Sequence, residues 1–474
     1  MNPLLLKTPA APAAPSWQDR IVALATRPAV SSLAPAKPSV VFESSPPATD
    51  PTYTDASKNT VDPSSDDAIG ALLARNGTPG QTGSVFAGLG QALLGRFTTE
   101  GANFSSSISG ATGADSTISL GIHTASGATV KLALSATADG LSVALNSDRT
   151  LSEGEKKAVA GLSRAFQDAV DGLSKQPPML SLDGLIAADP SVLTGVDLSA
   201  TVATAPGVHE TIDLHAGSDS RTLKIAGAAG SISLGLDMSQ PATWGNRAQR
   251  EASIANTLDQ IDAAATRGHA DTSLVALFKD GFSQLNSHYP PSPADASTRG
   301  TTRDLSSTDH ALLTGLADFQ ASIAQAGSSP NPMRSGERDT FNYELSQSTG
   351  LSGRNASDRH ISQSLSSHLT ASFHTSPWAD TALHLTNQLG SQNYNYTEID
   401  DSAHASTDIA YAKGKLVSAS VSHDANQDTR VRKYMVGQLI DDTDTPTHHE
   451  ATRDLLPLLK AMARPSAGTQ LRLG

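Results

Sequence analysis

Apolar and polar residues alternate in three consecutive segments of this chain, and no other feature restricts its fold as strongly. Apolar residues stand at every second position of 118–122, 130–134 and 141–145. A period of two places all of these side chains on one face of a strand. Ser126-Gly127 and Asp139-Gly140 supply the turns between the segments. The pattern predicts an antiparallel meander with one buried and one polar face.

A helix that can cover the buried face follows the meander. Ser152 and Glu155 have the spacing of a capping box, in which each side chain bonds the backbone N–H of the other residue. Apolar residues then recur at intervals of three and four from Val159 to Leu173, which is typical of an amphipathic helix. The predicted fold class is therefore α+β, with antiparallel β-meander sheets packed against amphipathic helices.

The same order of elements recurs with an offset of about 94 residues. Thr211-Ile212-Asp213-Leu214 repeats the pattern of Thr117-Ile118-Ser119-Leu120, and two more alternating segments follow it. Helical apolar stripes then run through 254–265 and 274–285. This recurrence indicates a duplicated three-strand plus helix module, βββα. The alternative is that threonine and alternating aliphatic residues recur by chance in a strand-rich chain.

Shifts in composition divide the chain into six expected units. The first is rich in Pro, Ala and Ser, which is typical of a disordered leader. In chain order the units are the leader (1–65), a helical hairpin (66–110), the duplicated modules (111–290), a linker with one helix whose stripe spans 312–323 (291–340), a β-meander domain with a strand at 382–389 among others (341–445), and a C-terminal helix and tail (446–474).

Composition also excludes several classes of function. The 474 residues include no cysteine, which removes disulfides, thiolate metal sites and thiol nucleophiles. The net charge of −13 argues against a nucleic-acid partner, which requires a basic surface. No apolar run approaches the roughly 18 residues of a membrane helix, and no Sec signal peptide is recognisable. We therefore expect no membrane span, and no motif indicates a cofactor.

Histidine is frequent, with 14 residues, so a metal site deserves consideration. His368 and His384 are the candidate ligands, because each falls on the polar face of an expected strand. His374 lies on the same strand as His368, but about 20 Å away, so these two cannot bind one ion. Solvated surface histidines are the alternative, and we expect no metal.

Two further features lie in the expected β-meander domain. Tyr394 and Tyr396 share one strand face, and an exposed aromatic pair can stack on a sugar or on a partner surface. Ordinary cross-strand packing is the alternative. Glu398, Asp400 and Asp401 are carboxylates of the kind that glycosidases use, although catalytic carboxylates normally come from separate strands at a set distance.

The lack of cysteine, the leader and the polar strands together suggest a function class. In composition the chain resembles substrates of flagellar or type III bacterial export. We predict a non-enzymatic binding or structural protein of bacterial type, which has a protein partner and is cytoplasmic or exported by a Sec-independent route. Tyr394 and Tyr396 are the predicted partner-binding residues. The alternatives are a hydrolase that uses the C-terminal carboxylates and histidines, and a cytoplasmic regulatory protein. The sequence leaves open the oligomeric state and whether the two modules share one sheet.

Overall fold

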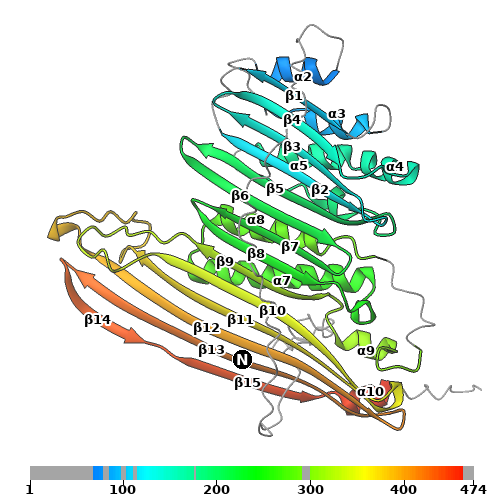
Figure 1. Cartoon of the computed structure of the whole chain (residues 1–474). Helices are drawn as coiled ribbons and strands as arrows, with labels where there is room; N and C mark the ends of the chain where they lie inside the picture. The colour runs from blue at the N-terminus through cyan, green and yellow to red at the C-terminus, as the bar shows by residue number, and fades with distance from the viewer. Residues whose placement is uncertain are drawn as a thin grey trace, which may run out of the picture.

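A computed structural model describes residues 68–77, 85–97, 103–109, 115–175, 178–290 and 299–462. Within these residues, fifteen strands form one antiparallel sheet (Figure 1). The strands are β1 (Phe104–Ser109), β2 (Ser116–Thr124), β3 (Thr129–Thr137), β4 (Gly140–Ser147), β5 (Leu193–Ala205), β6 (Val208–Gly217), β7 (Ser220–Gly227), β8 (Gly230–Asp237), β9 (Asp318–Gln325), β10 (Thr340–Gly353), β11 (Arg359–Thr375), β12 (Tyr394–Ala412), β13 (Lys415–Met435), β14 (Gln438–Asp444) and β15 (Thr447–Asp454). Their order in the sheet is β1-β4-β3-β2-β5, then β6 to β14 in sequence, and β15 pairs with β13.

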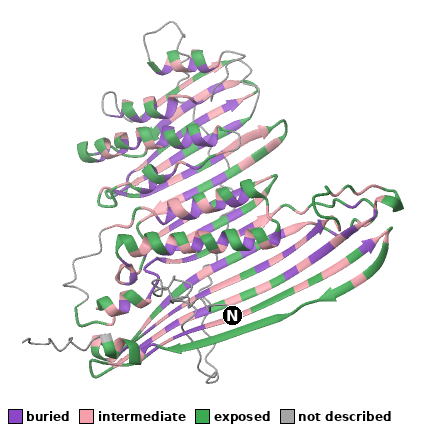
Figure 2. Ribbon diagram, turned by 180° about the vertical axis from the view of Figure 1, so that it is seen from behind, coloured by how far each residue is buried: buried purple, intermediate pink, exposed green. Residues whose placement is uncertain are grey.

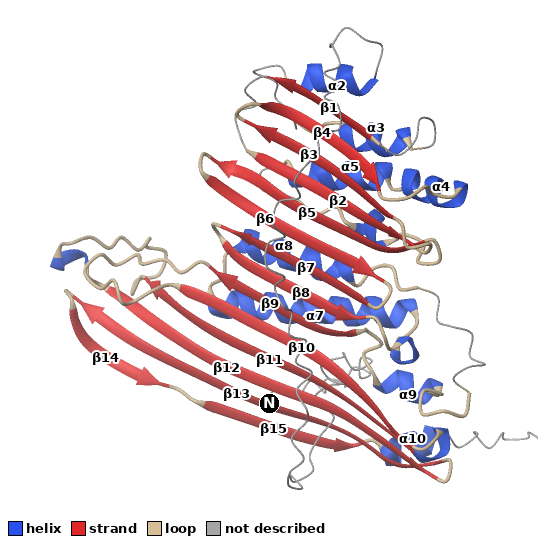
Figure 3. Ribbon diagram, viewed as in Figure 1, coloured by secondary structure: helices blue, strands red, loops and turns tan. Residues whose placement is uncertain are grey.

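The described α-helices lie on one face of this sheet (Figure 3). They are α2 (Ala68–Asn76), α3 (Leu89–Arg96), α4 (Glu153–Gly161), α5 (Ser163–Leu173), α6 (Asp183–Ile186), α7 (Arg247–Gly268), α8 (Thr272–Leu285), α9 (Ser307–Leu312) and α10 (Leu456–Met462). None of them has both the length and the apolar character needed to cross a bilayer. The antiparallel sheet with its helical layer confirms the predicted α+β class.

The alternation read from the sequence corresponds to β2, β3 and β4, and their apolar residues are buried against the helices. The capping box is present: the Ser152 N–H donates to Glu155 Oε2 at 2.9 Å, and the Glu155 N–H donates to Ser152 Oγ at 3.3 Å. The helix expected from one continuous stripe is divided at Leu162, where α4 ends and α5 begins.

The two expected modules share the sheet and lie on either side of β5. β2 and β6 both pair antiparallel with β5, so they run in the same direction. β3 and β4 extend from β2 on one side, whereas β7 and β8 extend from β6 on the other. The recurring units therefore fan out in opposite directions from one central strand. Whether they arose by duplication stays a prediction.

The helix predicted over 312–323 is wrong beyond its first residue. α9 ends at Leu312, and Phe319 and Ile323 lie in β9, where Ala321 completes an alternating buried face. Gly315 has a φ of +76°, a left-handed conformation that does not continue a helix. β9 pairs with β8 on one side and β10 on the other. It thereby joins the strands of the expected 111–290 and 341–445 units into one sheet.

The C-terminal strands are longer than the sequence pattern indicated. Alternation and β-propensity predict separate strands at 393–399, 407–411, 416–421 and 430–436. The first two fall within the single strand β12 except for Asn393, and the last two within β13 except for Val436. The strand expected at 382–389 is absent from the described structure, and a strand not anticipated, β15, precedes α10. The sequence Lys413-Gly414 predicts a hairpin turn, and the two residues form the turn between β12 and β13 with φ of 51° and 73°.

Two short helices cover one end of these long strands. Leu312 at the end of α9 and Leu459 of α10 pack with Leu455 against Ala419 and Val421 of β13. The leader (1–65) and the tail beyond 462 lie outside the described residues.

Candidate functional site

The face of the sheet that the helices do not cover is the largest unexplained surface of the protein. We call it the open face, and it consists of the strand side chains that alternate with the buried ones. It is polar because an antiparallel sheet can pack one face and leave the other to water. One row of directly opposed residues crosses eight strands: Ser119, Ser199, Asp213, Lys224, Ser233, Ser322, Glu344 and His368.

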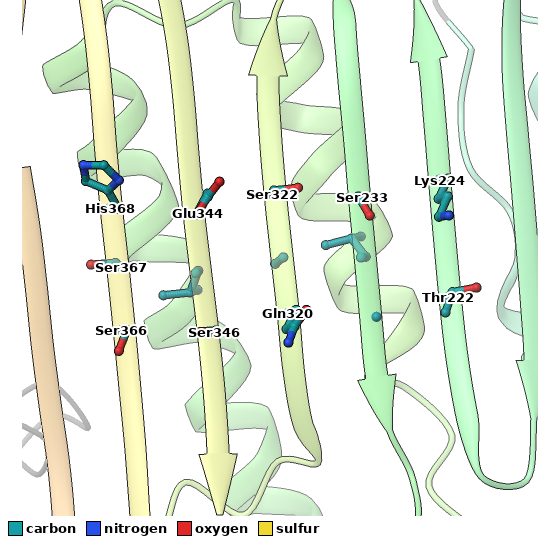
Figure 4. A pocket seen from close by; sticks show the side chains of 14 residues that line it. Thr222, Lys224, Ser233, Gln320, Ser322, Glu344, Ser346, Ser366, Ser367 and His368 are labelled. Atoms are coloured by element: carbon teal, nitrogen blue, oxygen red, sulfur yellow. The ribbon is translucent and has the colours of Figure 1, made fainter. Parts of the chain in front are cut away.

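The open face is hollowed where it crosses β7 to β11. The hollow has a volume of about 440 Å³, and Ser233 and Ser322 lie at its middle (Figure 4). Gly235 of β8, opposed to Gln320, also lines it. Lys224 lies on one side of it and Glu344 on the other, so the lining offers donors and acceptors as well as both signs of charge. The small residues Ser233, Gly235 and Ser322 of the neighbouring strands β8 and β9 make the surface recede at this place. This lining suits a polar ligand or a polar protein segment.

A second cluster on the open face joins β2, β5 and β6. His123 Nε2 lies 2.7 Å from Asp197 Oδ2, and His215 Nδ1 lies 2.6 Å from Asp197 Oδ1. The hydrogen bond from His215 holds the pKa of Asp197 below its ordinary value, and the bond to Asp197 raises the pKa of His215. The cluster therefore links three strands through a charge that varies with pH.

The Asp197→Asn substitution tests this linkage. A raised histidine pKa adds stability below the ordinary pKa of 6.5, and this stability is lost as the pH rises through the raised value. The lowered pKa of Asp197 adds stability above 3.8, which is lost as the pH falls through the lowered value. The stabilisation is therefore largest between these limits. We expect Asp197→Asn to cost about 0.5–1 kcal/mol at pH 5.5 and less at pH 8.5, because nearly half-exposed pairs are screened.

Urea unfolding at both pH values measures this difference. Asp213→Asn on β6 is the control, since Asp213 accepts a hydrogen bond from the Ser199 hydroxyl at 2.7 Å. If the free energy of unfolding depends on pH in the same way in both variants, the two histidines do not stabilise the sheet through Asp197.

Tyr394 and Tyr396 do not form the exposed pair that the sequence suggested. They lie on the open-face side of β12, but their side chains are buried, with relative exposures of 0% and 5%. Leu383 and Leu385, from the segment before β12, pack against them and Tyr434. The tyrosine pair is thus part of a small core between the sheet and its connecting segments.

The tyrosine hydroxyls are also committed to internal hydrogen bonds. Tyr394 Oη donates to Glu337 Oε2 at 2.8 Å, and Tyr396 Oη donates to the Arg338 carbonyl at 3.0 Å. Burial and the adjacent Glu337 carboxylate raise the pKa of Tyr394. This geometry favours the cross-strand packing alternative over direct contact with a partner.

The candidate metal ligands do not converge. His368 Nε2 bonds Asp400 Oδ1 at 2.8 Å on the open face, whereas His384 lies in the segment between β11 and β12 and not in a strand. His374 is buried between Asp339 and Glu337, with Nδ1 2.6 Å from Asp339 Oδ1. Across the described residues, no group of three or more His, Cys, Asp and Glu side chains is arranged to hold an ion.

The three C-terminal carboxylates are likewise separated. Glu398 pairs with Arg432 at 2.7 Å on the open face, where Asp400 also lies. Asp401 points to the helical face and is paired with Arg267 of α7. Since Asp400 and Asp401 lie on opposite faces, they cannot act on one bond. None of the three lines the hollow.

From the sequence, sheet faces are expected to contact a partner, but the hollow within the open face is not anticipated. The sequence does show the polar residues that alternate with apolar ones in each strand. Only the assembled sheet, however, aligns these polar residues in rows across the strands. Comparison with protein families, curated proteins and solved structures finds no match for the chain. The functional argument therefore depends on the geometry of the open face.

Proposed function

We propose that the protein is a non-enzymatic binding protein that receives a macromolecular partner on its open face. The observation that carries this proposal is the polar hollow over β7 to β11 on a sheet face that the described helices leave uncovered. Such a face presents many hydrogen-bonding groups on a scaffold of paired strands, and sites on regular elements are held more precisely than sites on loops.

The state of the side chains in the hollow supports binding. Among the described residues, Glu344 and Gln320 have no hydrogen-bond partner within the protein, although both line the hollow. A partner that donates hydrogen bonds to the Glu344 carboxylate and to the nearby hydroxyl groups would satisfy these unpaired side chains. A hydrolase would need a nucleophile and a base in mutual contact at the site. Ser366 of the lining bonds His404 Nδ1 at 3.0 Å, but His404 does not line the hollow, and no other serine or threonine of the lining is hydrogen-bonded to a histidine or a carboxylate there. The geometry thus favours binding over the hydrolase alternative.

Filling the hollow tests the proposal. The double variant Ser233→Trp/Ser322→Trp places two bulky side chains on directly opposed residues of β8 and β9. The matched control is Ser119→Trp/Ser199→Trp, which changes a directly opposed serine pair on β2 and β5, outside the hollow. We expect the first variant to weaken capture of the partner by about tenfold or more, since large side chains exclude it, and the control to retain it.

The measurement is affinity capture from cell extract with quantitative mass spectrometry, using the wild type and both variants. Circular dichroism establishes that each variant keeps the sheet. If both double variants capture the same proteins as the wild type in equal amounts, the hollow is not the binding site.

A further inference from the structure

The open face is far more acidic over β12 to β15 than the chain as a whole. The whole chain has 47 acidic and 34 basic residues. On this part of the open face the basic residues are Lys415, at the hairpin end of β13, and Arg430 and Arg432. The acidic residues there are Glu398, Asp400, Asp408, Asp424, Asp428, Asp442, Asp444, Glu450 and Asp454. We call this surface the acidic strip.

The two arginines do not neutralise the acidic strip. Arg432 is paired with Glu398, and Arg430 binds both oxygens of Asp442, at 2.7 Å and 2.8 Å. Each arginine is thus already committed to one carboxylate. Of the remaining seven carboxylates, Asp400 and Asp408 are hydrogen-bonded to histidines of β11, each at 2.8 Å, and Asp444 is opposed to Arg430. The other four are opposed by histidine, serine or acidic residues: Asp424, Asp428, Glu450 and Asp454.

Several of these carboxylates are direct neighbours across the strands. Asp400 is opposed to Asp428, and Asp424 is opposed to Glu450. Asp444 lies close enough to share a hydrogen bond with Asp428, which raises the pKa of Asp428. Like charges in directly opposed positions destabilise a sheet. The free protein therefore carries a repulsion that a cationic partner would relieve.

The acidic strip is also accessible. All eight residues of β15 are exposed, and β14 is exposed except at Asp441 (Figure 2). The two strands lie end to end along β13, interrupted at Pro446, and they form the last edge of the sheet. A partner can therefore approach from the open face without displacing any described element.

We propose that the acidic strip binds an extended Lys/Arg-rich segment of a partner protein. This inference rests on the proposed binding function and names the chemistry of the partner. Residues two apart on a strand lie roughly 6.7 Å apart on one face, as do alternate residues of an extended peptide. At twice this spacing, Asp424 and Asp428 on β13 and Glu450 and Asp454 on β15 match cations at every fourth position of an extended segment.

The geometry favours a peptide over a single ion. A calcium ion requires six to eight oxygen atoms at about 2.3–2.6 Å, whereas these carboxylates are spread along three strand lines. Nucleic acids and anionic membranes would be repelled by the same charges. A basic protein segment is the partner that the charge pattern fits.

Fluorescence anisotropy of the full chain with a labelled nona-arginine peptide tests this inference, with a Gly-Ser peptide of equal length as the neutral probe. The variant Asp400→Asn/Asp424→Asn/Asp428→Asn/Glu450→Gln removes four charges from the acidic strip. The control Asp168→Asn/Asp259→Asn/Asp280→Asn/Glu251→Gln removes an equal number of negative charges, three aspartates and one glutamate. These lie at exposed positions on α5, α7 and α8. We expect the strip variant to weaken peptide binding about tenfold or more, and the control less than about twofold.

Binding of the arginine peptide should also weaken steeply with salt, because exposed charges are screened. An equal loss of affinity for the arginine peptide in both variants would mean that net charge alone causes the binding, and it would overturn the inference. Equal affinity for the Gly-Ser peptide would overturn it as well. Displacement of the peptide by millimolar calcium would indicate that the acidic strip is a metal-ion site, and this result would also overturn the inference. The hollow experiment is independent of these outcomes, because Ser233 and Ser322 lie outside the strip.

Discussion

Replacing Arg359 with methionine is expected to lower the free energy of unfolding by about 3–5 kcal/mol. Arg359 of β11 is ion-paired with Asp309 of α9, and their side chains are only 6% and 0% exposed. Asp309 also accepts hydrogen bonds from the Ser306 N–H at 2.7 Å and from Tyr411 Oη at 2.8 Å. Without Arg359, a carboxylate remains in the interior without its counter-ion, and this is the physical cause of the loss.

The Arg354→Met variant is the matched control for this prediction. Arg354 pairs with Asp358 at 2.6 Å, but the two side chains are 85% and 31% exposed. An exposed pair of this kind contributes at most about 1 kcal/mol. Urea unfolding followed by circular dichroism compares the two variants. Equal and small losses would mean that the Arg359–Asp309 pair is hydrated in solution.

The Phe282→Ala substitution should destabilise the protein to a similar extent, by about 3–5 kcal/mol. Phe282 of α8 is fully buried, and its ring meets the ring of Phe319 edge to face, with centroids 5.2 Å apart. The substitution leaves a cavity between α8 and β9, which is the strand that joins the two halves of the sheet. Both lost apolar burial and lost packing contribute to the effect.

The control for this prediction is Leu458→Ala in α10, where the side chain is half exposed. It should change the free energy of unfolding by less than about 1 kcal/mol, since little apolar area is returned to water. Thermal unfolding of both variants provides the comparison. A loss below about 1 kcal/mol for Phe282→Ala would show that α8 closes over the cavity.

Features encoded over a few neighbouring residues could be predicted from the sequence. The strands near Ile118 and Ile212, the Ser152–Glu155 capping box and the helix after Asp271 all follow from local periodicity or capping. β5 was missed although Val196, Leu198 and Ala200 alternate in the same way. Export without a Sec signal stays a prediction, because the leader lies outside the described residues.

Features that depend on distant segments could not be predicted. The apolar residues at 316, 319 and 323 fit a helical spacing, whereas those at 319, 321 and 323 fit a strand, and only pairing with β8 and β10 decides between them. β12 and β13 were predicted as fragments because much of each strand is polar on both faces, so periodicity gives no signal.

The same limit applies to the candidate site. The period of two correctly placed Tyr394 and Tyr396 on one face, but residues such as Glu337 and Leu383, which bury them, come from segments without a regular pattern. The hollow depends on small residues from β8 and β9 that are far apart in the sequence. The rows of the open face are therefore a property of the assembled sheet.

The order of the strands also determines how the molecule responds to force. From β5 to β14 each strand pairs with its neighbours in the chain. Traction on the C-terminal edge would load the hydrogen bonds of β15 and β14 a few at a time, and then those of β13 and β12. β5 is held between β2 and β6, so the N-terminal strands do not separate in chain order. The C-terminal half can therefore unzip strand by strand in chain order, whereas the N-terminal half cannot be peeled away in the order of the chain.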